Sequence, residues 1–159
     1  MRKVSQFLET QATRLVGVLV AVLVVNVLLQ VLFRQVFSIP VTWTDEIARF
    51  AFLWMAMIAA AVQVKRKAHF AVTIIADKIP TRRALDVVIC TVMLFSAVTL
   101  FVQGVRYTIM GLDKMASTVP MQMSWIYAAI PAGALLMTFF LVEMILDELG
   151  WLGAAAEAA

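Results

Sequence analysis

Two acids and an arginine stand close together at Asp45, Glu46 and Arg49, directly in front of an apolar run that continues to Val64. Residues three or four apart share one face of a helix, so Arg49 can reach either carboxylate and form an ion pair. Such a charged group can fix the entry of a helix, dock a charged partner, or satisfy only itself. The surroundings that the rest of the chain provides decide between these uses.

Side chains that carry catalytic or metal chemistry are otherwise scarce. The chain has one histidine, His69, and one cysteine, Cys90. One histidine cannot ligate haem from both sides, and beside one cysteine it forms neither a zinc nor an iron–sulfur site. The chain also has no Gly-rich phosphate loop, no Ser-His-Asp set and no His-Glu-x-x-His motif. We therefore expect no enzyme activity and no cofactor, and we expect Cys90 to be a small buried hydrophobe.

The composition is that of an integral membrane protein. Of the 159 residues, 64% are hydrophobic and 14% are charged, whereas about a quarter of residues are charged in soluble domains. A helix needs about 20 mostly apolar residues to cross about 30 Å of hydrocarbon. The chain is therefore predicted to be one all-α membrane domain over residues 1–159, with four transmembrane helices at about 15–33, 44–64, 87–105 and 124–142.

The second of these helices explains the charged group. Phe50–Val64 alone spans about 15 residues, which is too short for a full crossing, so the helix has to include the charged turn. Thr44 is a plausible N-cap, and the acids then lie in the first turn, where the helix dipole favours negative charge. Arg49 can extend to the interface there at much lower cost than at mid-bilayer. The group marks the membrane boundary, and Trp43 suits the aromatic belt.

Lysine and arginine are divided unevenly between the two sides of the membrane. Four lie on one side and nine on the other, which are Arg2, Lys3, Arg14, Lys65, Arg66, Lys67, Lys78, Arg82 and Arg83. The positive-inside rule puts both termini and the loop 65–83 in the cytoplasm. Five of the nine, Lys65, Arg66, Lys67, Arg82 and Arg83, are expected to hold lipid headgroups, each contributing about 1 kcal/mol near an anionic surface. The basic balance thus implies contact with anionic lipid rather than with nucleic acid.

Two segments have the pattern of interfacial amphipathic helices. Apolar residues recur at helical spacing in the first dozen residues, and "FAVTIIADKIP" follows His69. Both can lie along the inner membrane surface. For the first dozen residues a frayed polar tail is the alternative.

Polar residues inside the predicted spans are neutral, so no proton or ion path is marked by charge. They fall on shared helix faces, Asn26 with Gln30, and Ser96 with Thr99 and Gln103. Helix-to-helix hydrogen bonding is their ordinary use, and contact with a substrate is the alternative. Pro131 and Gly133 can kink the fourth helix, but the other half of the chain has no counterpart, as the paired repeats of a self-contained transporter would require. These features favour an accessory subunit.

The run "WTDEIARFAFLWMAMIAAAVQVKRKAHF", from Trp43 to Phe70, resembles the small membrane subunit of tripartite ATP-independent periplasmic (TRAP) transporters. That family carries an aromatic residue, an acidic pair, an arginine three residues later, a tryptophan in the second helix, and a basic stretch ending in histidine. The matching residues here are Trp43, Asp45, Glu46, Arg49, Trp54, Lys65 to Lys67, and His69. The chain departs from the family pattern at Ala68 and Thr73, where members often have a glycine and an acid. A specific role for His69 is weakened accordingly.

The segment "MQMSWIYAAIPAGALLM", from Met121 to Met137, resembles the last helix of the same family, with an aromatic pair before Pro131 and Gly133. The resemblance implies a three-part uptake system in a bacterial inner membrane. A periplasmic substrate-binding protein would capture an organic anion, usually a carboxylate or sialic acid, and a large permease subunit would move it with sodium. The small subunit would brace the large one and help to dock the binding protein.

On this resemblance, Asp45, Glu46 and Arg49 would fix the helix entry or dock a partner, with a self-satisfied group as the alternative. Trp54 would pack against the large subunit, with lipid exposure as the alternative. His69 would be a solvated interfacial residue rather than a ligand. The partners, and not this chain, would select the substrate.

Two other functions fit the residues without the resemblance. One is a small autonomous exporter that works as a homodimer, although such exporters usually need an acid deep in a helix. The other is a membrane assembly or signalling protein. Neighbouring genes for a large permease and a secreted binding protein would favour transport over both.

Overall fold

The computed structural model describes residues 2–38, 42–66 and 82–148, and it confirms the all-α prediction for that part of the chain. The helices there are α1 (Arg2–Val36), α2 (Trp43–Lys65), α4 (Arg82–Met110), α5 (Ser124–Tyr127) and α6 (Ala129–Glu148). Four stretches are long and apolar enough to cross a membrane: Lys3–Val36, Trp43–Lys65, Ile89–Met110 and Ser124–Leu146.

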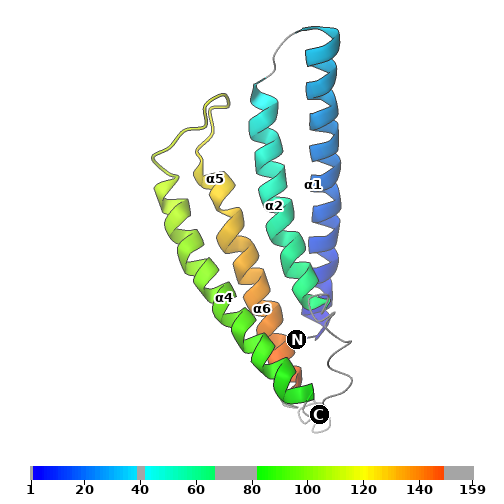
Figure 1. Cartoon of the computed structure of the whole chain (residues 1–159), viewed down its shortest axis with the longest axis vertical. Coiled ribbons are helices and arrows are strands. Elements are labelled where there is room, and N and C mark those ends of the chain that lie inside the picture. Colours follow the sequence, from blue (N-terminus) through cyan, green and yellow to red (C-terminus); the bar gives the residue numbers. More distant parts are fainter. Residues whose placement is uncertain (1, 39–41, 67–81, 149–159) are drawn as a thin grey trace.

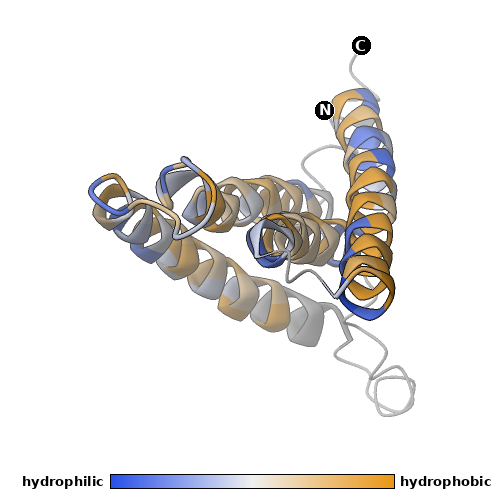
Figure 2. Ribbon diagram, turned by 90° about the horizontal axis from the view of Figure 1, so that it is seen from above, coloured by the Kyte–Doolittle hydropathy of each residue, from blue (hydrophilic) through white to orange (hydrophobic). Residues whose placement is uncertain are grey.

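The helices lie side by side in the order α1, α2, α6, α4, because the main contacts join α1 to α2, α2 to α6, and α6 to α4 (Figure 1). One apolar cluster fills the space where α2, α6 and α4 meet, around Ala61, Ala97 and Phe140. A second lies between α1 and α2, around Ala12 and Ile58. The outer helices α1 and α4 therefore keep most of their surface exposed. The α1 ribbon is apolar along most of its length, whereas α4 alternates apolar with more polar segments (Figure 2).

Helix α1 differs from the expectation for the first dozen residues. They neither turn away from the span nor form a tail, because one helix of 35 residues runs from Arg2 to Val36 without a break. At about 1.5 Å per residue it is about 52 Å long, well beyond about 30 Å of hydrocarbon. Its first turns are held by packing, since Ser5 is buried and Leu8 contacts the cluster around Phe140.

The fourth predicted span is interrupted at Ala128, between α5 and α6. Pro131 has no backbone N–H to donate to the carbonyl four residues earlier, which explains a break at this point. A Cβ on Gly133 would lie 2.7 Å from Met57 Cβ of α2, and a Cβ on Gly104 would lie 2.9 Å from Pro131 N. The residues of the Pro-x-Gly motif thus let α6 approach α2 on one side and α4 on the other.

Two predicted helix ends are wrong. Thr44 is not the N-cap of the second helix, because α2 begins at Trp43 and Thr44 is fully buried. The fourth helix does not stop at Glu143 but continues to Glu148, with Glu143 only 3% exposed. Helix α6 accommodates this acid because a cation from α2 lies against it.

Candidate functional site

The charged end of α2 is tied to α1 by two amides. Asn26 Nδ2 donates to the carbonyl oxygen of Thr44 at 2.7 Å, and Gln30 Nε2 donates to Asp45 Oδ1 at 2.6 Å. Because Asn26 and Gln30 lie four residues apart on one helix, both face α2. Their predicted role in helix-to-helix contact is confirmed, and the Asp45 carboxylate is held at the top of α2 by the second amide.

Glu46 is bound to a different part of the chain, the loop 111–123 between α4 and α5. Its Oε1 accepts the backbone N–H of Thr118 at 3.0 Å, and its Oε2 accepts that of Val119 at 2.8 Å. The carboxylate is 7% exposed, and beside it Ile47, Phe50 and Met121 line a hollow of about 150 Å³. Both oxygens of one acid therefore hold the tip of the loop against the start of α2.

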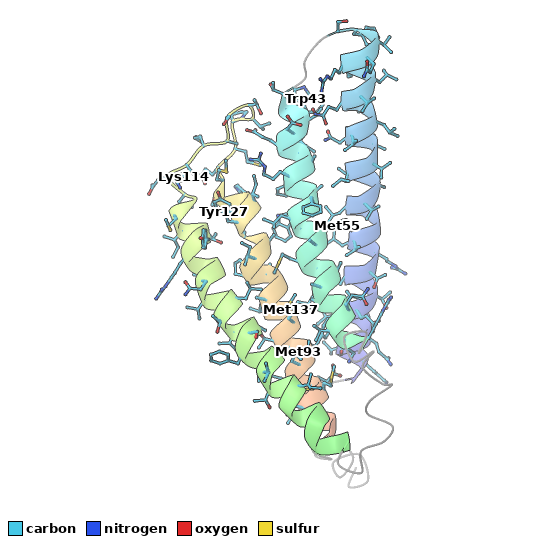
Figure 3. The ribbon with its side chains drawn as sticks, viewed as in Figure 1. Trp43, Met55, Met93, Lys114, Tyr127 and Met137 are labelled. Atoms are coloured by element: carbon cyan, nitrogen blue, oxygen red, sulfur yellow. The ribbon has the colours of Figure 1, made fainter. Side chains whose placement is uncertain are left out.

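The loop 111–123 is also ordered by its own backbone. Met115 and Gln122 form an isolated antiparallel bridge, and Ala116 N–H donates to the Met121 carbonyl at 2.9 Å. Its side chains Leu112 and Met115 are 51% and 68% exposed. Trp43 and Lys114 lie at this same end of the molecule (Figure 3), together with the end of α1 and the start of α2 (Figure 1). The loop is thus a fixed platform with apolar side chains on its surface.

Arg49 does not form the expected ion pair. Within the part of the chain that the structure describes, neither Asp45 nor Glu46 pairs with Arg49, whose side chain is exposed. The physical reason is competition: the Gln30 amide and two loop N–H groups already occupy the carboxylates. Arg49 is left as an exposed cation near the end of the span, where its long side chain can reach the interface.

Trp54 has a partner inside the chain. Its Nε1 donates to the carbonyl oxygen of Trp125 in α5 at 3.1 Å, and its ring stacks at a tilt on Phe50, with the centroids 6.0 Å apart. The side chain is half-buried, and Trp43 is 43% exposed. Trp54 therefore fixes α5 against α2, and its contact with a large subunit stays a prediction.

At the opposite end of the layer, two ion pairs join residues that the structure describes. Lys65 Nζ lies 2.6 Å from Glu143 Oε2, and Arg66 Nε lies 2.9 Å from Glu9 Oε1. Lys65 also lies over the Phe140 ring at 5.7 Å from its centroid. These two cations hold α2 to α6 and to α1 instead of being wholly free for headgroups. Lys67 and His69 lie outside the described residues, as do the side chains of Arg82 and Arg83, so their expected roles stay predictions.

The other sequence-predicted residues fall as follows. Cys90 is 1% exposed, with Sγ 3.6 Å from Met144 Sδ, which confirms the buried position. Ser96 and Thr99 do not join helices, because each hydroxyl donates to a carbonyl of its own helix and both side chains are exposed. No group of three or more His, Cys, Asp or Glu side chains that can hold a metal occurs among the residues described. Together, the hydrogen bonds at the start of α2 hold α1, α5 and the loop 111–123 against that helix. The site therefore anchors parts of the chain to one another.

Sequence reasoning missed Glu143 and the loop 111–123. In the sequence, Glu143 follows an apolar run, which is typical of a helix end. Only the structure shows that Lys65 of α2 pairs with Glu143 and that the helix continues beyond it. The loop contains Asp113, Lys114 and Pro120 and has the composition of an ordinary connection. Its link to Glu46 spans more than seventy residues, so no local spacing indicates it.

Comparison with known proteins identifies the family of this chain. Residues 8–150 match the family model of the tripartite ATP-independent periplasmic transporters, DctQ component. The chain is 27% identical to the sialic acid TRAP transporter small permease protein SiaQ of Vibrio cholerae, over 81% of this chain and 76% of that protein. It is 25% identical to a putative TRAP transporter small permease protein of Haemophilus influenzae, over 91% of this chain and 92% of that one.

A longer relative contains a similar segment. The sialic acid TRAP transporter permease protein SiaT of Haemophilus influenzae is 27% identical over 72% of this chain, but the match covers only 19% of that protein. The family match extends over most of the four apolar helices and includes the Glu46 anchor and the loop 111–123. The chain therefore belongs to the DctQ family of small TRAP transporter permease subunits, which are transporter components and not enzymes.

Proposed function

We propose that this chain braces the large permease of a sodium-coupled TRAP system that takes up organic anions, carboxylates or sialic acid, across a bacterial inner membrane. The observation that carries the proposal is the layer of helices with a fixed loop at one end. Its two broad faces and two edges can lie along a larger membrane protein, and the charged groups Glu46, Lys65 and Glu143 are engaged in holding it together. Coupling to sodium and selection of the substrate then belong to the partners.

The longer relative supports the choice of partner. SiaT of Haemophilus influenzae carries the similar segment in about a fifth of a single permease protein, so a segment of this kind works within one chain beside a much longer remainder. A separate small subunit would have to occupy the same position by packing non-covalently against the large permease. The large permease is accordingly the partner that we assign to this chain.

The loop 111–123 is the surface that we assign to docking the periplasmic binding protein. This requires both termini and the loop 65–83 to be cytoplasmic, as the unequal division of lysine and arginine favours. Glu46 holds the loop in one position, and a fixed surface loses less conformational entropy on docking than a mobile one does. Leu112 and Met115 offer exposed apolar side chains there, with Lys114 between them.

Proteoliposomes test the proposal. Vesicles contain a large TRAP permease of the same organism, with or without the chain, and its binding protein and a sodium gradient are supplied outside. Radiolabelled sialic acid and succinate are the probes. We expect uptake of one probe only when the chain, the binding protein and the gradient are all present. Equal uptake without the chain, or uptake by the chain alone, contradicts the proposal.

The orientation is tested separately in whole cells. In a Cys90→Ser background, a Lys114→Cys variant is treated with a membrane-impermeant maleimide after the outer membrane is permeabilised. We expect labelling of Lys114→Cys without lysis. Labelling that requires lysis would place the loop in the cytoplasm and exclude it as the docking surface.

A further inference from the structure

The outer face of α4 carries a stripe of polar residues on the side away from α6. Cys90, Ala97 and Gly104 are buried against the rest of the layer and mark the inner face of the helix. Roughly opposite, at spacings of three and four residues, lies an exposed set that we call the α4 stripe, which consists of Ser96, Thr99, Gln103 and Arg106. Because α4 is an outer helix of the layer and these side chains are exposed, the stripe faces away from the rest of the described chain.

The two halves of the α4 stripe differ in how their hydrogen bonds are satisfied. The Ser96 hydroxyl donates to the Val92 carbonyl at 3.0 Å, and the Thr99 hydroxyl donates to the Phe95 carbonyl at 2.9 Å. Gln103 and Arg106 have no hydrogen bond or ion pair with any residue that the structure describes, and both are exposed. Gln103 lies seven residues before the end of α4 at Met110, which is about 10 Å along the helix axis. Its amide therefore lies within the apolar stretch Ile89–Met110, about two turns from the end of that stretch.

An unpaired amide at that depth needs a partner, because hydrocarbon offers no hydrogen bond and burying a polar group without one is costly. Two amides of α1 show the difference. Asn26 and Gln30 of α1 are both turned toward α2 and bound there. Gln103 is turned away from the other helices that the structure describes, and a hydrogen-bonding group on another molecule would satisfy it.

We infer that the α4 stripe is the surface on which this subunit packs against a transmembrane helix of the large permease, an inference that rests on the proposed function. That helix presents a hydrogen-bonding group, an amide or a free carbonyl, to Gln103 and a carboxylate to Arg106. The two contacts lie one turn apart on α4, so one helix supplies both. The opposite edge of the layer faces lipid, since outer positions of α1 are aliphatic and exposed, among them Val18, Val25, Leu28 and Leu32.

A second copy of this chain is a poorer partner for the α4 stripe. Two copies inserted with the same topology bring their α4 helices together in parallel about a two-fold axis, so Arg106 would meet Arg106. Like charges at close range repel, most strongly where water is scarce. A carboxylate on a different protein removes this conflict, and for that reason we assign the stripe to the permease.

Photo-crosslinking tests the assignment in the complete complex. Gln103 in one variant and Leu28 in another are replaced by p-benzoylphenylalanine, and each chain is co-expressed with the permease and irradiated in native membranes. We expect an adduct of chain plus permease from position 103, at least ten times as abundant as from position 28. An adduct with a second copy at position 103, no protein adduct there, or equal yields from the two positions would overturn the assignment.

A pair of variants adds a second readout. Thr99→Trp puts a bulky ring into the α4 stripe. Leu28→Trp puts the same ring on the outer side of α1, where Leu28 is 63% exposed. We expect Thr99→Trp to lower the recovered permease at least ten-fold at equal chain expression, and Leu28→Trp to change it less than two-fold. Equal recovery with both variants contradicts the assignment. If the unchanged chain recovers no permease at all, the proposed function fails, whereas recovery with crosslinks from the α1 edge overturns only the choice of surface.

Discussion

Glu46 accepts a hydrogen bond of 2.8 Å from the backbone N–H of Val119, which lies in the loop 111–123 between α4 and α5. The second carboxylate oxygen binds the neighbouring N–H of Thr118 in the same way. An acid at the start of a transmembrane helix thus organises a distant loop instead of pairing with the arginine three residues after it. The subunit presents a fixed surface at that end as a result.

Glu46→Gln is expected to loosen this loop. The amide keeps one oxygen acceptor but turns an NH₂ group toward a backbone N–H, so one of the two charged hydrogen bonds is lost and the loop is held less firmly. Hydrogen exchange of the Thr118 and Val119 amides in detergent micelles measures the effect. Asp45→Asn is the control, since Asp45 is exposed and bound to Gln30 rather than to the loop. Unchanged protection of both amides in Glu46→Gln would show that the anchor is not formed.

Gly133→Ala is expected to destabilise the contact between α2 and α6. The new Cβ would lie 2.7 Å from Met57 Cβ and 3.0 Å from the Met57 carbonyl oxygen, so the helices have to separate. Overpacking of this kind costs about 1 to 3 kcal/mol. The free energy of unfolding in mixed micelles, followed by tryptophan fluorescence, gives the value. Gly17→Ala is the matched control, because nothing lies within 4 Å of its Cβ position. A loss in Gly17→Ala as large as in Gly133→Ala would refute the packing argument.

Lys65→Met is expected to destabilise the layer more than the double variant Lys65→Met with Glu143→Leu. The single change leaves Glu143, 3% exposed, without its cation, and breaking a buried ion pair in this way costs about 3 to 5 kcal/mol. The double change removes the charge that is left behind and restores apolar contact with α2. Unfolding of the two single variants and the double variant forms a thermodynamic cycle. Additive losses in that cycle would mean that the two side chains are not coupled.

Asn26→Leu is expected to weaken the contact between α1 and α2 by about 0.6 to 1.7 kcal/mol, the range for hydrogen bonds between transmembrane helices. The amide to be removed is 5% exposed and donates to the Thr44 carbonyl. Gln103→Leu is the comparison, because that amide has no partner among the described residues and faces outward. The stability of the isolated subunit should be unchanged in Gln103→Leu. A larger loss there than in Asn26→Leu would contradict the assigned directions of the two amides.

Much of the fold can be predicted from the sequence, because the length of an apolar segment and the thickness of the membrane set the four helices almost by themselves. Asn26 and Gln30 were also predictable as a pair, since their spacing puts them on one face. The partners of the acids were not predictable. From local spacing, Arg49 is the expected partner of Glu46. Only the folded chain brings the backbone N–H groups of Thr118 and Val119 within hydrogen-bonding distance of the Glu46 carboxylate.

The roles of Lys65, Arg66 and Glu143 were also not predictable, because their partners lie far away in the sequence. Lys65 and Arg66 fit the basic collar of a membrane protein, and Glu143 fits the end of a helix. The structure joins Lys65 to Glu143 because α2 and α6 are neighbours in the layer, although α4 lies between them in the sequence. The order of helices in the layer depends on close approaches at Gly133 and Gly104, which act between distant parts of the chain.

In the proposed function, this chain works as part of a complex with a large permease. The test is affinity purification of the chain from native membranes in mild detergent, followed by mass spectrometry of the bound proteins. We expect a single large TRAP permease in about equal amount with the chain. Recovery of the chain alone as a small homo-oligomer would contradict it.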